Sequence, residues 1–519
     1  MTTAATQRVS IAPDGAAYAI PGAAAWEAQF ASIAAAAAEH RRRGGTVVVV
    51  QGLGFVGTAV CAALAAAEQG AGEPVHFVIG VDLANEESFW KIAKVEEGSA
   101  PIASPDPQLG AAVSAAFARG NLRATAAEAA YGLADTVVVD VDLGTVGVPR
   151  GVGEIEVDVE ALERAVRVVG RHMRAEALVV IETTVPVGAC RNIVLPLLAA
   201  ERAARGIDTP VRIANAYERV MPGPRYLDSV RAYPRSFAGL DSESGTLTRA
   251  FLRTFLDSER APLQELPDLE SAELAKLLEN SYRAANIAFV HEWTRLAEGI
   301  GVDLWAVIES IRVRAGTHDN LRYPGLGVGG YCLTKDSLLA QWGARELLGS
   351  DVALQMTLDA LEINFAMPLH TVAHVKALVE GSLDGKVIAL LGVSYLPDLA
   401  DTRNSPSETV LRELEAAGAT VRVHDPEVVR WLERPDVTVL KSLDDALGGA
   451  AGVVLAVPHS AYRELGSSDL VALVGGPAFA VDAQNLLGDD DARRLHAAGW
   501  RVSGVGKGHW RAEGLGEPS

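Results

Sequence analysis

Runs of β-branched residues alternate with helix-forming stretches in the first part of the chain. The apolar runs occupy residues 46–50 (TVVVV), 75–81 (VHFVIGV), 135–141 (DTVVVDV) and 177–182 (ALVVIE). Strands that are apolar without interruption are covered on both faces, as in a parallel sheet with helices on either side. The pattern therefore predicts a Rossmann-like, doubly wound parallel-sheet domain over residues 44–215.

An Ala-rich extension, residues 1–43, precedes this domain. Residues 23–40 within it have high helix propensity and predict a surface helix that leads into the first strand. Glu27 and Glu39 argue against a transit peptide, because such peptides contain few acidic residues.

The strand signals vanish between about residues 216 and 378, where residues 271–299 predict one long helix. Ser271 is its expected N-cap, and Gly299 is its expected end. We therefore expect a mostly helical central domain over residues 216–378.

The α/β alternation then returns. Its apolar runs are residues 386–392 (KVIALLG), 420–426 (TVRVHDP), 452–458 (GVVLAVP) and 479–482 (FAVD). A helix start is well specified at Ser405-Pro406-Ser407-Glu408, which orders an N-cap, a first-turn proline and a capping-box glutamate. Residues 379–519 should form a second Rossmann-like domain. The expected fold class is α/β, with two doubly wound parallel sheets joined by a helical domain with a long helix.

Composition argues against several classes of protein. The 519 residues include 46 Lys and Arg against 66 Asp and Glu, which gives a formal net charge of -20. Nucleic-acid binding needs a dense basic face, so this balance argues against it. No uncharged apolar run reaches the roughly 18 residues of a membrane helix, and no secretion signal is evident. We expect a cytoplasmic protein without a nucleic-acid or membrane partner.

The glycine motif GLGFVG directly follows the first strand and opens a helix. Gly52, Gly54 and Gly57 allow a tight turn and a close approach to a pyrophosphate, and Phe55 and Val56 begin the helix beneath it. The second strand ends in Asp82, where an acidic residue would bind the ribose hydroxyls. A carboxylate at Asp82 disfavours a 2′-phosphate, so the motif predicts NAD as cofactor.

The three cysteines, Cys61, Cys190 and Cys332, are too few and too far apart for a disulfide scaffold or a four-thiolate zinc site. No metal site is predicted. We interpret Cys61 and Cys190 as small buried apolar side chains. Cys332 lies in the glycine-rich segment GLGVGGYCLTKD, near Lys335 and Asp336. A thiolate there can approach a substrate carbon, and a nearby cation would make it reactive.

Three polar residues of the long helix, Lys276, Asn280 and Arg283, fall on one face. Such a stripe is usually solvated. If the lysine is buried beside the amide, the pair would instead suit stabilising an alkoxide or accepting a proton. Two further loops, residues 182–188 (ETTVPVG) and 215–223 (NAYERVMPG), follow strands and are equally open to a functional or a purely structural reading.

Six segments together resemble the UDP-glucose/GDP-mannose dehydrogenase family of nucleotide-sugar 6-dehydrogenases along nearly all of residues 44–510. They are GLGFVG, ETTVPVG, YERVMPG, the helix over residues 273–292, GVGGYCLTKD, and residues 397–398 with 401–406. The resemblance implies a four-electron oxidation of the sugar C6 alcohol to a carboxylate, with two NAD reduced in succession.

The resemblance also implies residue roles. Cys332 would capture the aldehyde as a thiohemiacetal, from which a thioester forms. Lys276 and Asn280 would hold the oxyanions, and Asp336 would help to activate water. The implied acid/base set is completed by Glu218 and Thr184.

The segments YERVMPG and ENSYRAANIAFVHE resemble the UDP-N-acetylhexosamine branch, in particular UDP-N-acetyl-D-mannosamine dehydrogenases, whereas CLTKD resembles UDP-glucose dehydrogenases. The substrate is therefore left open between a UDP-hexose and a UDP-N-acetylhexosamine. The implied substrate contacts are Glu218, Arg219, Val220, Lys276, Asn280, Arg283, His318 and Gly329. The implied cofactor contacts outside the glycine motif are Thr184, Lys335 and Arg403.

The chain also departs from the family pattern. Gly316-Thr317-His318 stands where the acetylhexosamine branch has a His-x-Arg pair, Asp142-Leu143 replaces a Pro-Thr pair, and Leu396 replaces a lysine. Arg403 matches an arginine that reaches a neighbouring subunit's cofactor, so a homodimer or larger homo-oligomer is expected.

Three alternatives stay open. One is a non-catalytic protein that binds NAD or a nucleotide sugar, and another is a two-electron enzyme that releases the 6-aldehyde. The third is a dehydrogenase with the same cofactor fold that acts on a β-hydroxy acid and needs no cysteine.

Overall fold

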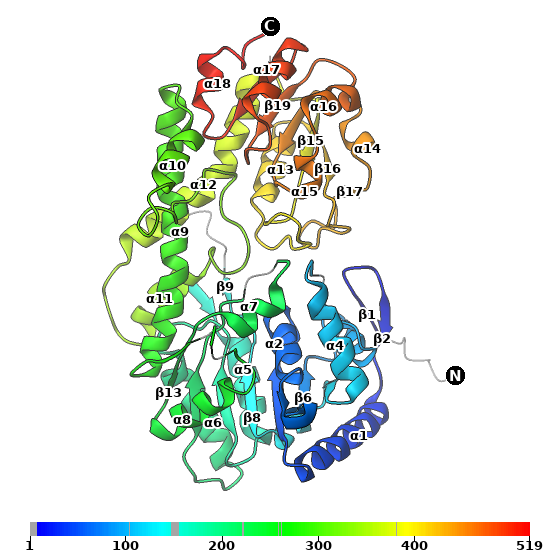
Figure 1. The fold of residues 1–519 in the computed structure, drawn as a ribbon, viewed down its shortest axis with the longest axis vertical. Coiled ribbons are helices and arrows are strands. Elements are labelled where there is room, and N and C mark those ends of the chain that lie inside the picture. Colours follow the sequence, from blue (N-terminus) through cyan, green and yellow to red (C-terminus); the bar gives the residue numbers. More distant parts are fainter. Residues whose placement is uncertain are drawn as a thin grey trace. The chain divides into compact units, whose positions relative to one another are not determined.

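The computed structural model describes residues 8–102, 104–146, 155–220, 223–257, 259–260, 262–379 and 381–518. These residues form two compact units. The first contains the chain up to residue 147 together with Ile155–Leu278 and Leu338–Val352, and the second contains Glu279–Ser337 and Ala353–Ser519. Figure 1 labels the elements of each unit along the chain. The expected domain limits at residues 43, 215 and 378 stay predictions.

The first unit is built on an eight-stranded sheet with the order β14-β13-β12-β11-β8-β3-β6-β7. Its pairs are parallel except for β12 with β13. The strands are β3 (Thr46–Gln51), β6 (His76–Val81), β7 (Leu122–Thr125), β8 (Thr136–Val139), β11 (Leu178–Ile181), β12 (Arg212–Asn215), β13 (Arg235–Gly239) and β14 (Leu263–Glu265). The order reverses at β3, which pairs with both β6 and β8, so a ligand crevice is expected at the carboxyl end of β3.

The predicted strands β3, β6, β8 and β11 are confirmed. The strands β13 and β14 correct our expectation, because we found no strand signal between about residues 216 and 378. They are short, and the antiparallel pairing of β13 with β12 sets them outside the alternating pattern that was used to find the others.

Helices cover both faces of this sheet. The helix α2 (Phe55–Ala65) packs against α4 (Pro107–Arg119) and α7 (Tyr226–Ala232), while α5 (Glu160–His172) packs against α6 (Leu195–Ala203). The predicted N-terminal helix is confirmed as α1 (Ala23–Arg42), and it buries Ile33 and Ala37. The remaining helices are α3 (Phe89–Glu96) and α8 (Ser242–Leu252), with short helical turns η1 (Gly70–Gly72), η2 (Glu128–Leu133) and η3 (Cys190–Val194).

Three short ribbons complete the first unit. They are β1 (Val9–Ile11) with β2 (Ala17–Ala19), β4 (Glu68–Gln69) with β5 (Glu73–Pro74), and β9 (Gly144–Val146) with β10 (Glu156–Asp158).

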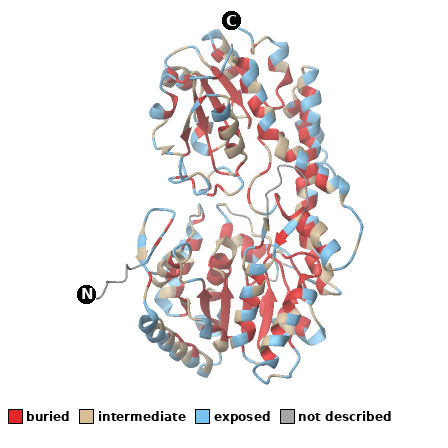
Figure 2. Ribbon diagram, turned by 180° about the vertical axis from the view of Figure 1, so that it is seen from behind, coloured by how far each residue is buried: buried red, intermediate tan, exposed pale blue. Residues whose placement is uncertain are grey.

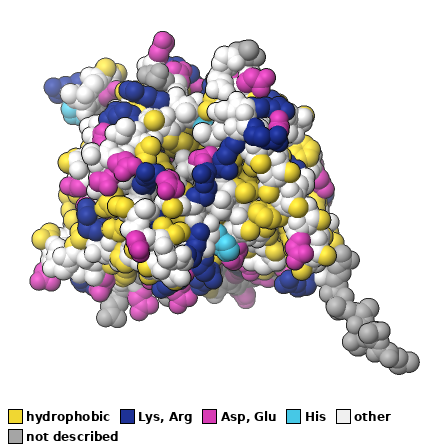
Figure 3. Space-filling model, turned by 90° about the horizontal axis from the view of Figure 1, so that it is seen from below, with side chains coloured by type: hydrophobic (Ala, Val, Ile, Leu, Met, Phe, Trp, Pro, Cys, Tyr) yellow, Lys and Arg dark blue, Asp and Glu magenta, His cyan; other side chains and the backbone are white. Residues whose placement is uncertain are grey.

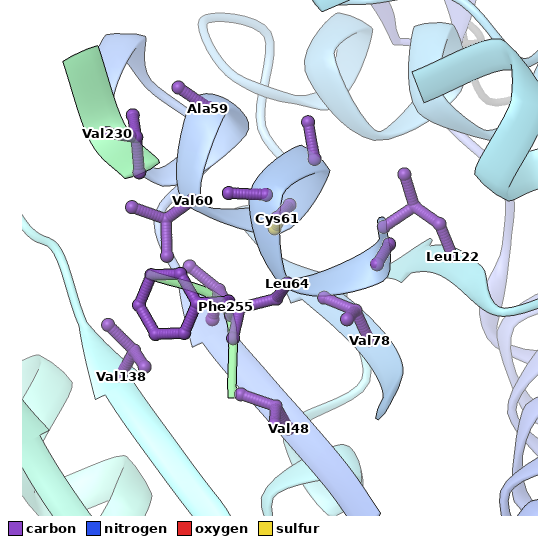
Figure 4. Packing of buried hydrophobic residues seen from close by; sticks show 14 of the residues in the cluster. Val48, Ala59, Val60, Cys61, Leu64, Val78, Leu122, Val138, Val230 and Phe255 are labelled. Atoms are coloured by element: carbon purple, nitrogen blue, oxygen red, sulfur yellow. The ribbon is translucent and has the colours of Figure 1, made fainter. Parts of the chain in front are cut away.

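The core beneath α2 is apolar throughout. Cys61 is buried in it, and burial raises the pKa of its thiol, so our interpretation of Cys61 as a core side chain is confirmed. Figure 4 shows the side chains around it, among them Val48, Ala59, Val60, Leu64, Val78, Leu122, Val138, Val230 and Phe255.

The long helix α9 (Leu269–Gly299) runs from the first unit into the second. Its predicted end at Gly299 is confirmed. Its predicted cap is wrong, because the helix starts two residues before Ser271. The Asp268 side chain accepts a hydrogen bond from the Ser271 N–H at 2.8 Å, which satisfies one of the unpaired donors of the first turn.

The second unit contains a six-stranded, all-parallel sheet with the order β17-β16-β15-β18-β19-β20. The strands are β15 (Val387–Leu391), β16 (Thr420–His424), β17 (Val439–Leu440), β18 (Gly452–Leu455), β19 (Phe479–Asp482) and β20 (Arg501–Gly504). Figure 2 shows the central strands of both sheets as buried. The expected α/β class with two parallel-sheet domains and a long central helix is thus confirmed.

The helices of the second unit include the predicted helix at Pro406, which is confirmed as α13 (Pro406–Ala416) with Ser405 as its N-cap. The others are α10 (Leu304–Arg312), α12 (Gln355–Leu378), α14 (Leu443–Leu447), α15 (Ser460–Arg463), α16 (Ser467–Val474), α17 (Asp489–Ala497) and α18 (Gly508–Ala512), and α11 (Asp336–Glu346) begins here and continues in the first unit.

One buried carboxylate joins the loops at the carboxyl ends of β15, β16 and β18. Asp425 accepts hydrogen bonds from the Val393 N–H at 2.7 Å and the Ser394 N–H at 3.1 Å, and it lies 3.2 Å from His459 Nε2. Burial raises the pKa of Asp425, but His459 and the backbone donors outweigh burial and hold the pKa below its usual value. These loops lie where the sheet order reverses, as a nucleotide-binding domain requires.

We expect Asp425→Ala to lower the stability of the protein by about 3 kcal/mol, because it leaves buried donors without an acceptor. Urea unfolding would measure the loss. Asp436→Ala is the control, since Asp436 is exposed and pairs with the partly buried Arg434, so its loss should change stability far less than the loss of Asp425. Equal losses in both variants would contradict this role of Asp425.

Candidate active site: the glycine turn and the cysteine loop

The turn between β3 and α2 has the close backbone contacts that a dinucleotide site needs. Gly52 has φ 98°, and a Cβ there would lie 2.2 Å from the Asp140 carbonyl oxygen. A Cβ at Gly57 would lie 2.0 Å from the Gly52 carbonyl oxygen, whereas a Cβ at Gly54 would meet nothing within 4 Å. The first and third glycines thus permit tight packing, and the second leaves space for a ligand above the turn.

The N-terminus of α2 is suited to a pyrophosphate. Its N-cap, Gly54, has no side chain to cap it, and its first turn, which starts at Phe55 and Val56, contains no acidic residue. The Gly57 N–H donates to the Asp140 carboxyl. N–H groups at the start of a helix can bind an anion. At the end of β6, the Asp82 carboxylate is held by the Leu53 N–H at 2.9 Å and by Lys91 Nζ at 3.2 Å.

A second carboxyl group, Asp140, lies at the same turn and was missed by the sequence analysis. Its Oδ2 would lie 3.1 Å from a Cβ on Gly57. Burial raises the pKa of Asp140 well above its usual range, and nearby Glu182 and Asp142 add to the effect. The raised pKa favours the neutral form of this carboxyl, which reduces the negative charge beside the phosphate site. The departure that we noted at Asp142-Leu143 was the available signal, since Asp140 lies on the same strand end.

The face of α9 that carries Lys276 is not a solvated stripe. The Lys276 side chain is only 8% exposed, and its Nζ donates to the Glu218 carbonyl oxygen at 2.7 Å and lies 3.5 Å from Glu218 Oε1. The ammonium also lies 5.8 Å from the centre of the Tyr217 ring. The structure thus brings two of the predicted catalytic residues, Lys276 and Glu218, into contact.

A buried ion pair supports the same strand ends. Arg235 Nη1 lies 2.6 Å from Glu182 Oε1 and 3.2 Å from the carbonyl oxygen of Ala216. Burial raises the pKa of Glu182, and Arg235 opposes that rise. Thr184, which follows in the same loop, is half-buried. The role of Arg235 could not be predicted from the sequence, because Arg235 lies 53 residues from its partner Glu182.

The ETTVPVG loop is attached to α9 by Glu273. This buried carboxylate accepts hydrogen bonds from the Gly188 N–H at 2.6 Å and the Cys190 N–H at 2.7 Å. Burial raises the pKa of Glu273 to about 7, although both backbone donors oppose the rise. Cys190 is fully buried beside it, and burial raises the pKa of its thiol, which confirms our interpretation of Cys190 as a core residue.

The cysteine loop lies in the second unit and has an exposed nucleophile candidate. Cys332 is exposed, and its carbonyl oxygen accepts the N–H groups of Lys335 and Asp336. The buried Asp336 carboxylate binds the Asn280 amide at 2.6 Å through Oδ2 and Lys335 Nζ at 3.2 Å through Oδ1. The structure therefore joins three of the predicted residues, Asp336, Asn280 and Lys335, in one cluster.

The residues 395–406 pack tightly on this loop. A Cβ at Gly329 would lie 2.8 Å from Tyr395 Cβ, and the Gly330 N–H donates to the Arg403 carbonyl oxygen at 3.0 Å. The Arg403 guanidinium is bidentate on Asp401 and lies 5.5 Å from the centre of the Tyr331 ring. Arg403 is thus paired within its own chain, and its expected contact with a cofactor stays a prediction.

The other predicted substrate residues are less closely grouped. In the first unit, Arg219 contacts Tyr217, and the Val220 N–H donates to Glu218. In the second unit, His318 is exposed, and its Nδ1 lies 2.8 Å from the hydroxyl oxygen of its neighbour Thr317. Met221 and Pro222 of the YERVMPG motif lie outside the described residues.

Arg322 is a cation that the sequence analysis missed. Its Nε is buried and has no hydrogen-bond partner among the described residues. Burial lowers the pKa of Arg322, and the positive charges of Arg283 and Arg312 lower it further. Several guanidinium groups in one place are stable only with an anion nearby. The segment Arg322-Tyr323-Pro324, just before the glycine-rich loop, was the available signal.

Three sequence profiles of one family match this chain along most of its length. Those of the UDP-glucose/GDP-mannose dehydrogenase family match residues 46–250 (NAD binding domain), 270–365 (central domain) and 389–489 (UDP binding domain). The chain belongs to this family. It is therefore a member of a family of NAD-dependent nucleotide-sugar dehydrogenases, and the resemblance stated from the motifs is confirmed.

Individual relatives agree with this assignment. UDP-N-acetyl-D-mannosamine dehydrogenase of Methanocaldococcus jannaschii is 29% identical over 442 residues, which cover 84% of this chain and 92% of that protein. The solved structure of the Pyrococcus horikoshii UDP-D-ManNAc dehydrogenase has a TM-score of 0.76 at 25% identity and covers 89% of this chain and 100% of the other. That of the Methanosarcina mazei NDP-N-acetyl-D-galactosaminuronic acid dehydrogenase has a TM-score of 0.73 at 26% identity, with 91% and 98% covered.

NAD is the cofactor of this family member, as the glycine motif predicted. The residues present fit it, because Gly54 leaves space above the turn and Asp82 stands at the end of β6. No helix in the described part of the chain is long and apolar enough to cross a membrane. The face in Figure 3 has acidic and basic side chains side by side, so the negative net charge does not make this face uniformly acidic.

The raised pKa of Glu273 predicts a pH-dependent stability. Between a pH of about 4.5 and about 7 the folded protein binds more protons at Glu273 than the unfolded chain, so stability falls as the pH rises through this window and is then constant. The loss is about 3 kcal/mol over the whole window. Urea midpoints measured against pH should fall less across this window in Glu273→Gln than in the wild type, by the contribution of Glu273.

Glu270→Gln is the control for this measurement. Arg191 lowers the pKa of Glu270, so its titration lies below the window, and the variant's curve should run parallel to that of the wild type. A Glu273→Gln curve that is also parallel to the wild type would refute the assigned pKa.

Proposed function

We propose that this chain is an NAD-dependent UDP-sugar 6-dehydrogenase that oxidises the sugar C6 alcohol to a carboxylate in two successive two-electron steps. The observation that carries the proposal is the exposed Cys332 thiol in a glycine-rich loop whose Asp336 carboxylate is fixed by Asn280 and Lys335. Bound NAD accepts the electrons of each oxidation. The residues of the chain orient the sugar, stabilise its charged oxygen and transfer its protons.

In the first oxidation, the C6 hydroxyl loses its proton while the aldehyde forms. The Lys276 ammonium is buried and oriented by Glu218, so it can stabilise a developing alkoxide without reorganisation. Glu218 and Thr184 belong to the same unit and complete the acid/base set of this step.

In the second oxidation, the Cys332 sulfur bonds to the aldehyde carbon, and the Asn280 amide, one helical turn from Lys276, donates to the resulting oxyanion. Removal of two electrons from this adduct leaves a thioester. Water then attacks the thioester carbon, Asp336 accepts a proton from the water, and the C–S bond breaks to restore the thiol. Asp336 is poised for this task because its two oxygens are already held by Asn280 and Lys335.

The substrate in this proposal is a UDP-hexose or UDP-N-acetylhexosamine. The relatives favour the acetylated class of substrate. Two of them are named as a UDP-N-acetyl-D-mannosamine dehydrogenase and an NDP-N-acetyl-D-galactosaminuronic acid dehydrogenase. The diphosphate of the substrate needs positively charged side chains. Arg283 and Arg322 in the second unit are two candidates, and the charge of Arg283 lowers the pKa of Arg322. A bound diphosphate would reduce this repulsion.

A homodimer or larger homo-oligomer is part of the proposal. The part of α9 in the second unit exposes an apolar face that is unusual for a protein surface in water. Its members are Tyr282, Phe289, Trp293 and Leu296, and Ile300 follows directly after the end of the helix; each is about half exposed or more. Pairing of this face with a second copy would remove it from solvent.

Replacing the nucleophile tests the chemistry. The wild type should form about two NADH for each UDP-sugar consumed, and Cys332→Ser should lower acid formation by about 10³-fold or more, because no thioester can form. The measurement is NADH absorbance against sugar acid, with UDP-N-acetylmannosamine and UDP-glucose as substrates. Cys61→Ala, which removes a core thiol, should keep the count of about two. About one NADH per UDP-sugar in the wild type would indicate aldehyde release, and no NADH would indicate a binding protein. Full activity of Cys332→Ser would refute the role of Cys332 as nucleophile.

Replacing Arg322 tests the diphosphate contact. Arg322→Ala should raise KM for the UDP-sugar by about 10- to 100-fold with a smaller change in kcat, since a charge-assisted contact to the substrate is lost. Steady-state kinetics would measure this. Arg314→Ala, at an exposed position, is the control and should leave KM unchanged. A KM that is equal in the two variants would remove Arg322 from the substrate site.

A further inference from the structure

Two histidines and a glutamate converge in the second unit, apart from the residues assigned to catalysis. His370 and His374 lie one turn apart on α12, and Glu298 lies at the end of α9. Glu298 Oε2 is 2.7 Å from His370 Nε2 and 3.1 Å from His374 Nε2, and the two Nε2 atoms are 3.2 Å apart. All three side chains are largely buried, with at most 17% exposed.

The surrounding residues orient this group. His374 Nδ1 lies 2.6 Å from Ser503 Oγ at the end of β20. The Gly506 N–H donates to Glu298 Oε1 at 2.7 Å, which leaves Oε2 directed at the imidazoles. Metal-binding histidines commonly bond through their second ring nitrogen in this way, which fixes the ring and its tautomer.

Two kinds of occupant satisfy this arrangement. When both Nε2 atoms carry protons, two N–H groups donate to Glu298 Oε2, and the Ser503 hydroxyl can donate to His374 Nδ1. When His374 Nδ1 instead donates to Ser503, the neutral ring presents a lone pair at Nε2, and this lone pair faces a carboxylate oxygen and the Nε2 of His370. One cation between the three atoms suits this second state, because each atom then donates a lone pair to it.

We propose that Glu298, His370 and His374 bind one divalent transition-metal ion, with Zn²⁺ as the ion that the ligands suit best. Imidazole nitrogen and carboxylate oxygen are both zinc ligands, and bonds of about 2.0–2.1 Å in a tetrahedron place ligand atoms about 3.3 Å apart. Two of the three separations, 3.1 Å and 3.2 Å, are close to this value, and the third, 2.7 Å between His370 Nε2 and Glu298 Oε2, would widen on binding the ion. Two histidines at i and i+4 on one helix form a recurrent zinc-binding pair. Water takes the fourth position.

The ion stabilises the second unit by joining elements that are far apart in sequence. Its ligands come from α9 and α12, and their supporting groups come from β20 and the loop that follows it. Two carbonyl oxygens of that loop accept hydrogen bonds from the start of α10. The Val505 oxygen accepts from Trp305 Nε1, and the Gly506 oxygen accepts from the Leu304 N–H. The site therefore links the two central helices to the C-terminal sheet.

Metal titration of the full-length protein tests the site. The protein is stripped with a chelator in a Cys332→Ser background, so that the exposed thiol cannot bind the ion, and Zn²⁺ is then added in a calorimeter. We expect one Zn²⁺ per chain and a higher unfolding temperature with Zn²⁺. His370→Gln and His374→Gln should each weaken binding by at least about 100-fold, and Ser503→Ala should weaken it by about 10- to 100-fold.

His509→Gln is the matched control. His509 lies 2.9 Å from Asp489 and 3.9 Å from Asp303 in a second group of one histidine and two carboxylates. A loss of Zn²⁺ in this variant alone would therefore move the ion to that group and overturn the proposal. Should a ligand variant fail to fold, Co²⁺ added to the Cys332→Ser protein decides the matter. Visible d–d bands of a tetrahedral nitrogen–oxygen site support the proposal, and absence of Zn²⁺ uptake or of these bands refutes it.

Discussion

The Asp336 carboxylate at the start of α11 is the interaction on which the candidate chemistry depends. A buried charge is costly unless it is paired and hydrogen-bonded, and here Asn280 and Lys335 provide both. Because the same loop carries Cys332, the geometry that satisfies Asp336 also fixes the backbone beside the thiol. Removal of either partner would leave the buried carboxylate with only one of these two contacts and would weaken its hold on the loop.

Backbone packing has the same role in the first unit. The turn after β3 exists because Gly52 and Gly57 allow carbonyl oxygens to lie where any Cβ would stand. The open space at Gly54 and the start of α2 follow from that turn, and together they suit a pyrophosphate. An acidic protein can therefore bind an anionic cofactor, because the donors are backbone groups and the nearby Asp140 has a raised pKa.

The two units show how burial changes the meaning of a sequence motif. Lys276, Asn280 and Arg283 could have formed a solvated stripe, and only the burial of Lys276 against Glu218 excludes that reading. Ser271 has the composition of an N-cap, yet Asp268 takes that position because the helix begins two residues earlier. The short strands β13 and β14 were not predicted, since their register comes from the pairing of β13 with β12 and of β14 with β13, and not from their own pattern.

The sequence by itself determined the alternation of strands and helices, the glycine turn, the family and the cofactor. These depend on residues close together in the chain, whose periodicity and backbone freedom act locally. Only the tertiary structure decided which distant side chains meet. Glu273 with the backbone of the ETTVPVG loop, Arg235 with Glu182, and Glu298 with His370 and His374 are each brought together across more than fifty residues. No spacing rule reveals such groups, because their proximity and their pKa values arise from burial that the fold alone creates.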